Sequence, residues 1–476
     1  MPDYLLGIDN GSQSTKVVIF DTTGRPVAGG RARLRPNDTP RPGVVEHPDD
    51  DLWHSICVAS AEAMRQFGGD PAEIVGVGLC TIRFCRAMVR ADGTLAHPVL
   101  SWMDGRVSRP YVRGDFPGTT HVTTSSGYIT RRMTGRTVDT AANYQGMWPI
   151  DTDTWQWLPD GEAFDACGYP REALFDLALP GELLGEVTEE ASRATGIPAG
   201  LPVFATSNDK AVEALGSGLR EPGDVLLSLG TYIASMSVGE RNVRESTHFW
   251  TNFASEPHRY LYESNGIRRG MWTVSWERDL FGREASLAAA EAGLSVEDYL
   301  NREAAMVPAG SDGLLTVLDW LAPTDEPWRK GAIVGFDGRQ GRAHMYRSVL
   351  EAIAMTMAGK SELMAAELGT SYDRVIVSGG GSNSDLMMQI VADCYGIPSV
   401  RTELNNAASL GSAICAAVGT GVFAGFDEAT RAMVRPAAAF QPDPANHEFY
   451  TRLRPIHAAL ASALADTNRQ LHGLTG

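Results

Sequence analysis

Cysteine is scarce in this chain of 476 residues, and its copies are isolated from one another in the sequence. No two of them form a C-x-x-C pair; they lie at Cys57, Cys80, Cys85, Cys167, Cys394 and Cys415. Small disulfide scaffolds and zinc knuckles depend on closely spaced cysteines. The spacing therefore indicates neither class and is typical of a reducing compartment.

Positive charge is also in short supply. The chain has 41 Lys and Arg residues against 58 Asp and Glu residues, which gives a formal net charge of −17, and we find no local basic patch. An acidic surface repels phosphate backbones and anionic lipid headgroups. We therefore expect no nucleic acid and no membrane surface as the main partner.

The N-terminus lacks a basic region followed by an apolar stretch, so we expect no signal peptide and a cytoplasmic protein. One uncharged run, residues 404–426, has the length of a membrane span. It is rich in Ala, Gly, Ser and Asn, which transfer poorly into lipid. We interpret this run as a buried helix that ends near Gly419 and Gly421.

Alternating strand and helix patterns predict an α/β fold. Hydrophobic residues make up 43% of the chain and charged residues 21%, which is ordinary for a globular protein. Two apolar, β-branched runs, 4–9 and 16–21, flank Asn10-Gly11, a strong hairpin signal. A helical pattern at 48–67 and strand patterns at 74–79 and 87–90 follow.

The middle of the chain repeats the opening in outline. A strand pattern at 201–205 and a short helical pattern at 209–215 precede two strand runs, 224–228 and 232–238, which flank Leu229-Gly230-Thr231. This second hairpin indicates a duplicated lobe instead of a short repeat. We predict one domain over residues 1–218 and another over 219–476.

Two turns have the composition of phosphate-binding loops. Asp9 ends a strand beside the turn that leads to Lys16, where backbone N–H groups and hydroxyls can converge on phosphate oxygens. Gly379-Gly380-Gly381-Ser382 lies between a strand pattern and a helical pattern, so a ligand can approach its backbone. The alternatives are a plain hairpin and a compact strand-to-helix connection.

The segment Ser207-Asn208-Asp209-Lys210 follows a buried strand and opens a helix. A carboxylate in this position is held rigidly and partly out of water, so it can accept a proton from a hydroxyl nucleophile. The alternative interpretation of Asp209 is a helix cap, which is a common role for aspartate.

Five segments in this order resemble motifs of the FGGY family of carbohydrate kinases, in the actin-like ATPase superfamily. They are a first phosphate motif at 7–16, a catalytic aspartate segment at 209–218, a second phosphate motif at 229–231, a C-terminal signature at 331–351 and an adenosine-binding region at 378–411. The likeness covers most of the chain. It implies an α/β fold of two actin-like, ribonuclease H-like lobes with an ATP cleft between them.

The resemblance also implies roles for the residues at matching positions. Asp209 is the base that takes a proton from the substrate hydroxyl, and Asp9 holds Mg²⁺. The residues implied to bind ATP are Ser12, Gln13, Lys16, Gly230, Thr231, Gly335, Gly379, Gly380, Gly381 and Ser382.

The sugar pocket is expected to combine Arg83, Trp102 and Asp104 with Asp209. Trp102 and Asp104 belong to a W-x-D-x-R pattern that matches the family. An indole offers a flat apolar face to the C–H side of a polyol, while Asp104 and Arg83 can bond its hydroxyls. A core tryptophan and a surface ion pair are the alternative.

The implied activity is ATP- and Mg²⁺-dependent phosphorylation of a terminal hydroxyl of a small sugar or polyol, with a xylulose-type pentulose favoured. The alternatives are a kinase for glycerol, a tetritol or a linear signalling sugar, and a non-catalytic sugar- or nucleotide-binding regulator. Phe84 stands where glycerol kinases have Glu, and Lys210 stands where Gln or a small residue is usual. The resemblance is compatible with a homodimer.

Overall fold

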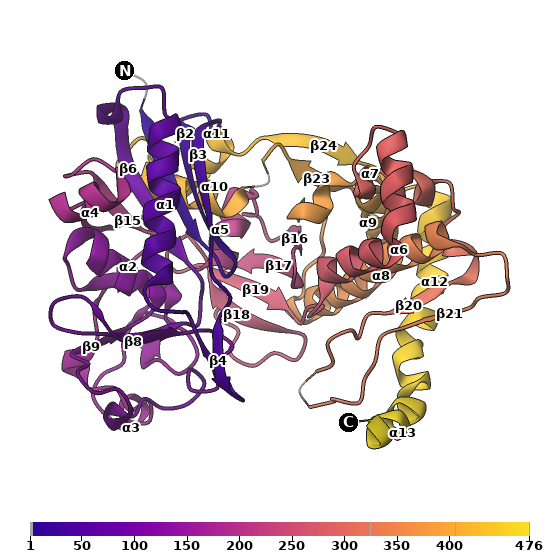
Figure 1. Ribbon diagram of the computed structural model, residues 1–476, viewed down its shortest axis with the longest axis horizontal. Helices are drawn as coiled ribbons and strands as arrows, with labels where there is room; N and C mark the ends of the chain where they lie inside the picture. Colours follow the sequence, from indigo (N-terminus) through magenta and orange to yellow (C-terminus); the bar gives the residue numbers. More distant parts are fainter. Residues whose placement is uncertain (1–2, 324, 405, 476) are drawn as a thin grey trace.

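Two β-sheets, one from each half of the chain, form the framework of the two lobes in Figure 1. The structure is a computed structural model that describes residues 3–323, 325–404 and 406–475. The first sheet has the order β14-β15-β6-β1-β2-β3, and the second has the order β18-β19-β17-β16-β22-β23-β24. The predicted α/β class is confirmed.

The first lobe opens with the predicted hairpin. Strands β1 (Tyr4–Asn10) and β2 (Ser14–Asp21) are antiparallel, and β1 is parallel to β6. Both hairpin strands are almost entirely buried, which explains their continuous apolar pattern. The sheet is completed by β3 (Pro26–Arg33), β6 (Ile74–Thr81), β14 (Leu183–Glu186) and β15 (Pro202–Ala205).

The second sheet repeats this arrangement. Strand β16 (Asp224–Leu229) is antiparallel to β17 (Ile233–Gly239) and parallel to β22 (Arg374–Ser378), as β1 is to β2 and β6. The duplication read from the two hairpins is therefore confirmed at the level of strand pairing. The remaining strands are β18 (Phe249–Phe253), β19 (Tyr260–Ser264), β23 (Ser399–Thr402) and β24 (Pro436–Phe440).

Helix α10 (Ala407–Gly419) comes late in the sequence but packs on β1 and β6 of the first sheet and on α5 (Asp209–Gly216). The buried helix predicted in the uncharged run is confirmed, and it ends at Gly419 as expected; Asn405 of that run lies outside the described residues. No helix in the described part of the chain is long and apolar enough to cross a membrane.

Glycines permit this packing. A Cβ on Gly7 of β1 would lie 2.0 Å from the carbonyl O of Ser409, and one on Gly78 of β6 would lie 1.9 Å from the carbonyl O of Ser412. Contacts this short do not occur, so the backbones of sheet and helix touch only because both strand positions lack a side chain.

Helices α1 (Asp51–Gln66) and α2 (Ser125–Thr134) complete the first lobe; α1 packs on β2 and β3, while α2 contacts β6 and β7. A five-stranded sheet of order β4-β5-β8-β7-β9 lies below them in Figure 1. The smaller elements of this lobe are β4 (Asp38–Arg41), β5 (Val44–Glu46), β7 (Arg86–Val89), β8 (Leu95–Leu100), β9 (His121–Thr123), β10 (Val138–Thr140), β11 (Ile150–Asp151), β12 (Gln156–Trp157), β13 (Asp176–Ala178), α3 (Glu162–Asp165) and α4 (Glu189–Thr195).

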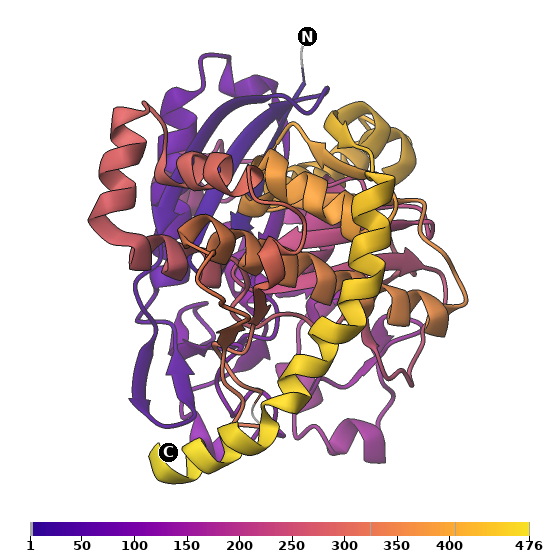
Figure 2. The same cartoon turned by 90° about the vertical axis from the view of Figure 1, so that its right-hand side faces the viewer.

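The second lobe is covered by long helices, among them α8 (Arg342–Leu368) and α9 (Asp385–Tyr395). The chain ends in two helices, α12 (Pro444–Ala463) and α13 (Ala465–Thr475), which cross the face turned toward the viewer in Figure 2. The others are α6 (Gly270–Glu291), α7 (Val296–Ala305) and α11 (Phe426–Met433), with the short strands β20 (Leu315–Val317) and β21 (Ala332–Val334).

Helix α6 carries an unusual buried acid. Glu277 is fully buried, and neither carboxyl oxygen has a hydrogen-bond partner among the described residues. Desolvation raises the pKa of Glu277 from 4.5 to about 8. The folded protein therefore holds this side chain protonated at neutral pH, whereas the unfolded chain ionises it.

Because Gly78 lies against α10, adding one methyl group at this position should lower the stability of the protein strongly. Gly78→Ala should lower the free energy of unfolding by about 3 kcal/mol, because sheet and helix must separate to admit the Cβ. Gly29→Ala is the control, since a Cβ on this β3 residue would lie 3.6 Å from its nearest neighbour, an ordinary contact. Urea unfolding of both variants measures the difference, and equal stability would contradict the packing argument.

We expect the Glu277→Gln variant to be more stable than wild type, by an amount that depends on pH. Ionisation favours the unfolded chain between its ordinary pKa of 4.5 and the folded value of about 8. Gln cannot ionise, so the free energy of unfolding of Glu277→Gln does not fall in this way. The difference between the variant and wild type should grow by about 1.4 kcal/mol per pH unit between about pH 5 and pH 8. Denaturation curves across this range test it, and a pH-independent difference would show that the raised pKa is wrong.

Candidate active site

The tips of the two repeated hairpins are open to solvent. Ser12 and Gln13 are exposed in the turn between β1 and β2, and Thr231 is exposed in the turn between β16 and β17. Gly230 is half-buried beside Thr231. Hydroxyl and amide groups in both turns are thus available to a phosphate chain, as the two phosphate motifs predict. Their roles stay predictions.

Asp9 lies near the end of β1, almost fully buried, with Lys16 Nζ 3.8 Å from its Oδ2. Desolvation raises the pKa of Asp9 to about 6, and Lys16 opposes that rise only in part. A second cation would stabilise the ionised carboxylate, so its oxygens fit a divalent ion such as Mg²⁺.

The described residues contain no cluster of three or more His, Cys, Asp or Glu side chains that could hold a metal. Such a cluster is not required for Mg²⁺, which keeps several waters and binds through one or two carboxylates together with substrate phosphates. Asp9 alone, beside an open phosphate turn, therefore fits the ion when it arrives with a nucleotide.

Asp209 is the first residue of α5, and it is not the cap of that helix. Asn208 is the N-cap, because its side chain accepts a hydrogen bond from Ala211 N. The capping alternative for Asp209 is therefore wrong, and its carboxylate is left to face the site with 29% of the side chain exposed. Desolvation raises the pKa of Asp209, while the nearby Arg83 opposes the rise.

Arg83 joins the two lobes beside Asp209. It follows β6 of the first lobe, and its Nη1 and Nη2 donate to the carboxylate of Glu263 in β19 at 2.7 and 2.9 Å. Its Nε lies 3.8 Å from Asp209 Oδ1, and its guanidinium sits 4.8 Å from the centre of the Trp250 ring. Sequence analysis missed Glu263, because no motif marks this single acid in a distant strand.

Lys210 belongs to a second bridge between the lobes. Its Nζ donates to Glu213 Oε2 at 2.8 Å on the same helix and to Ser228 Oγ at 2.9 Å on β16. Glu213 Oε1 also accepts from Ser228 Oγ at 2.7 Å and from Ser378 Oγ at 2.5 Å on β22. Four polar side chains thereby tie α5 to the two central strands of the second sheet.

The glycine turn after β22 packs against the second hairpin. Gly379 has φ of 83°, and a Cβ there would lie 2.5 Å from the carbonyl O of Leu229. The sequence predicts a helix directly after this turn, but a 3₁₀ turn (Gly380–Asn383) intervenes and Ser384 caps α9. Gly379–Ser382 and Gly230 thus lie together.

Gly335 lies elsewhere in the second lobe. It follows β21, in a two-stranded sheet separate from the main one, and its positive φ brings it against Gly313. Its predicted part in nucleotide binding stays a prediction.

The two remaining pocket candidates differ in accessibility. Trp102 is half exposed. Asp104 is buried, and its carboxylate accepts hydrogen bonds from Val45 N at 2.8 Å and from the backbone and guanidinium of Arg106 at 2.7–2.9 Å. Asp104 thus belongs to a largely buried ion pair with Arg106 instead of the surface pair of the alternative, and Trp102 is not in the core. Substrate binding by either residue stays a prediction.

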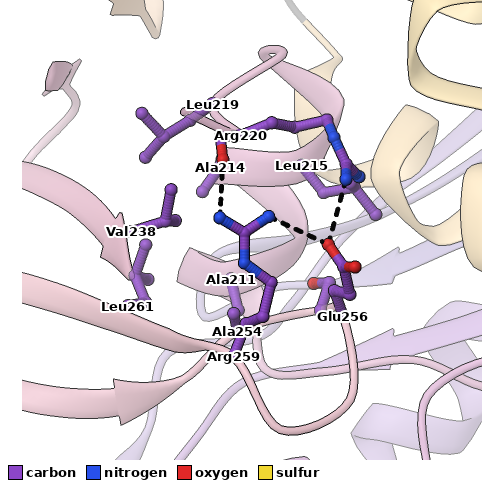
Figure 3. Close-up of a pocket in the computed structure, with 11 residues that line it drawn as sticks. Ala211, Ala214, Leu215, Leu219, Arg220, Val238, Ala254, Glu256, Arg259 and Leu261 are labelled. Carbon is purple, nitrogen blue, oxygen red and sulfur yellow. Dashed lines mark hydrogen bonds and ion pairs between the residues drawn. The ribbon is translucent and has the colours of Figure 1, made fainter. Parts of the chain in front are cut away.

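A small pocket on the other side of α5 contains none of the predicted site residues (Figure 3). Its apolar wall includes Ala211 and Ala214 of that helix. Its charged groups are already paired, since Glu256 accepts from Arg220 at 3.0 Å and from Arg259 at 3.1 Å (Figure 3). This pocket therefore offers no free charge to a ligand.

Comparison with known proteins agrees with the two-lobed site. Residues 4–112 match the N-terminal domain of the FGGY family of carbohydrate kinases, and residues 225–420 match its C-terminal domain. The chain belongs to the FGGY family and is an ATP-dependent carbohydrate kinase.

Individual relatives cover nearly the whole chain. It is 47% identical to the uncharacterized sugar kinase YgcE of Escherichia coli K12, over 94% of this chain and 91% of the relative. It is 26% identical to the autoinducer-2 kinase of the same strain, over 94% and 92% of the two chains. The crystal structure of xylulose kinase from Rhodospirillum rubrum matches with a TM-score of 0.81 at 24% identity, covering 98% of this chain and 100% of the other.

Proposed function

We propose that this kinase transfers the γ-phosphoryl group of ATP to a terminal hydroxyl of a small sugar, with a xylulose-type pentulose as the favoured substrate. The observation that carries the proposal is the position of Asp209, partly exposed at the start of α5 and beside the guanidinium of Arg83. A hydroxyl next to this carboxylate has both a proton acceptor and a hydrogen-bond donor in reach.

Asp209 acts as the general base in this proposal. It accepts the proton of the attacking hydroxyl, and its raised pKa makes it a stronger base than an ordinary aspartate. Arg83 opposes part of the rise in pKa that burial of the Asp209 carboxylate causes. Phosphoryl transfer otherwise depends mainly on positioning and charge stabilisation.

The two lobes divide the binding work. We assign the sugar and the base to the first lobe, residues 1–218, and the nucleotide to the second, residues 219–476. Ser12, Gln13 and Thr231 would face the phosphates, and the Gly379–Ser382 turn would face the adenosine. Asp9 would hold Mg²⁺, which, when bound, neutralises negative charge on the phosphate oxygens.

A linear signalling sugar is the second candidate substrate. The similarity to an autoinducer-2 kinase over most of both chains supports it, as the fold shared with a xylulose kinase supports a pentulose. A non-catalytic regulator is disfavoured, because a protein that only binds has no use for a buried base such as Asp209. Turnover of candidate substrates separates these proposals.

If Asp209 is the general base, the isosteric variant Asp209→Asn should lose most of its activity. Asp209→Asn should lower kcat at least about 100-fold, because the amide cannot accept the hydroxyl proton. The assay is ADP release with Mg-ATP across ketopentoses, hexuloses, pentitols, tetritols and glycerol. Asp466→Asn, in the exposed first turn of α13, is the matched control and should retain wild-type activity. If the rate of Asp209→Asn is within a few-fold of wild type, Asp209 is not the base.

Asp9 predicts a change in metal dependence. Asp9→Asn removes the charge but keeps the shape, so the Mg²⁺ concentration for half-maximal rate should rise by about tenfold or more. Titration of Mg²⁺ at fixed ATP measures this shift. Asp3→Asn, an exposed change just ahead of β1, serves as the control. An unchanged Mg²⁺ requirement in Asp9→Asn would place the metal elsewhere.

A further inference from the structure

The guanidinium of Arg83 lies between two carboxylates, those of Glu263 and Asp209. Nη1 and Nη2 form a bidentate pair with Glu263, and Nε faces Asp209. Its flat faces lie against Trp250 and Phe84, at 4.8 and 5.3 Å from the ring centres. Arg83 is thus held in place, and a ligand carboxylate that approached it would meet Glu263 at the Nη1–Nη2 fork and Asp209 beside Nε at the other fork.

Glu263 cannot easily release Arg83. It lies in β19, its side chain is only 1% exposed, and Arg83 is its sole ion-pair partner among the described residues. Breaking a buried pair leaves an uncompensated charge away from water, which is strongly unfavourable. A substrate carboxylate that displaced Glu263 from Arg83 would leave Glu263 buried and unpaired, and this cost would weaken the binding of the substrate.

The charges around the base add to a negative total. Arg83 contributes one positive charge, while Glu263 and Asp209 contribute one negative charge each. Lys210 is engaged by Glu213, and Lys16 by Asp9, so neither nearby ammonium is unpaired. An anionic group placed beside Asp209 would meet like charge in a largely buried setting, where repulsion is strong.

The pair also links the two lobes. Arg83 follows β6 in the first lobe, and Glu263 belongs to β19, which lies beside the first lobe in Figure 1. Glu263 therefore places a negative charge of the second lobe beside Arg83 of the first.

We propose that Glu263 is a specificity-determining residue that reserves the site for uncharged sugars and polyols and excludes sugar acids. It does so by occupying the guanidinium of Arg83 and by adding a second negative charge beside Asp209. Hydroxyl groups still fit, because they can donate to the carboxylates and accept from the remaining N–H groups of Arg83. This inference rests on the proposed function, because it concerns the substrate of the same site.

Matched ligand pairs test the proposal without turnover. Each pair has one carbon skeleton as an alditol and as an aldonate: glycerol with glycerate, ribitol with ribonate, and glucitol with gluconate. Isothermal titration calorimetry of the full chain gives the two dissociation constants. We expect wild type to bind the neutral member at least tenfold more tightly, and Glu263→Gln to reduce this ratio at least tenfold by improving the binding of the acid.

A charge-preserving variant controls for structural damage. Glu263→Asp keeps the negative charge, so it should retain the preference for the neutral ligand even if the shorter side chain weakens both affinities. Wild-type protein that binds an aldonate as tightly as its alditol would overturn the proposal, as would an unchanged ratio in Glu263→Gln. Should Glu263→Gln fail to fold, the ratios of wild type and Glu263→Asp still decide.

The failure of this inference is distinguishable from failure of the proposed function. An active Asp209→Asn would remove the proposed base while leaving the preference for neutral ligands intact. Conversely, a wild-type protein that lacked this preference would overturn the inference, while its ADP release could still depend on Asp209.

Discussion

The backbone contact between α10 and the first lobe is the constraint on which the site depends. Gly7 and Gly78 let α10 touch β1 and β6, and Gly216 of α5 is equally close, since a Cβ there would lie 1.9 Å from the carbonyl O of Ala407. Of the elements that α10 touches, β1 carries Asp9 near its end, β6 is followed by Arg83, and α5 begins with Asp209. One helix from the second half of the chain therefore fixes the relative positions of all three charged groups.

The lobes are further joined by buried polar bridges, which lie beside an apolar contact of Ala211 and Ala214 with Leu226 of the second sheet. Glu213 links α5 to β16 and β22 through two serines, and Arg83 links β6 to β19. Such bonds form only at short range and in defined geometry, and breaking them leaves buried charge. They therefore favour the one arrangement of the two lobes in which these bonds can form.

The sequence was informative wherever the signal was local. The Asn10-Gly11 hairpin, the helix that starts at Asp209 and the duplicated strand pairing all rest on neighbouring residues, and all were predictable. Glu263 was not, because its partner Arg83 lies 180 residues away and a lone acid in an apolar strand has no periodicity or motif to mark it. That Asn208 caps the helix and leaves Asp209 free for the proposed catalytic role was likewise invisible, since either residue type can cap a helix.

Glu263 also explains how Asp209 can serve as a base next to an arginine. A bidentate bond from Arg83 to Asp209 would stabilise the ionised carboxylate and make it a poor proton acceptor. Glu263 takes both terminal nitrogens instead, which leaves only Nε facing Asp209 at 3.8 Å, beyond hydrogen-bond distance. Burial then outweighs the arginine, and the pKa of Asp209 stays raised. The same acid that would exclude anionic substrates thus preserves the basicity that the proposed reaction requires.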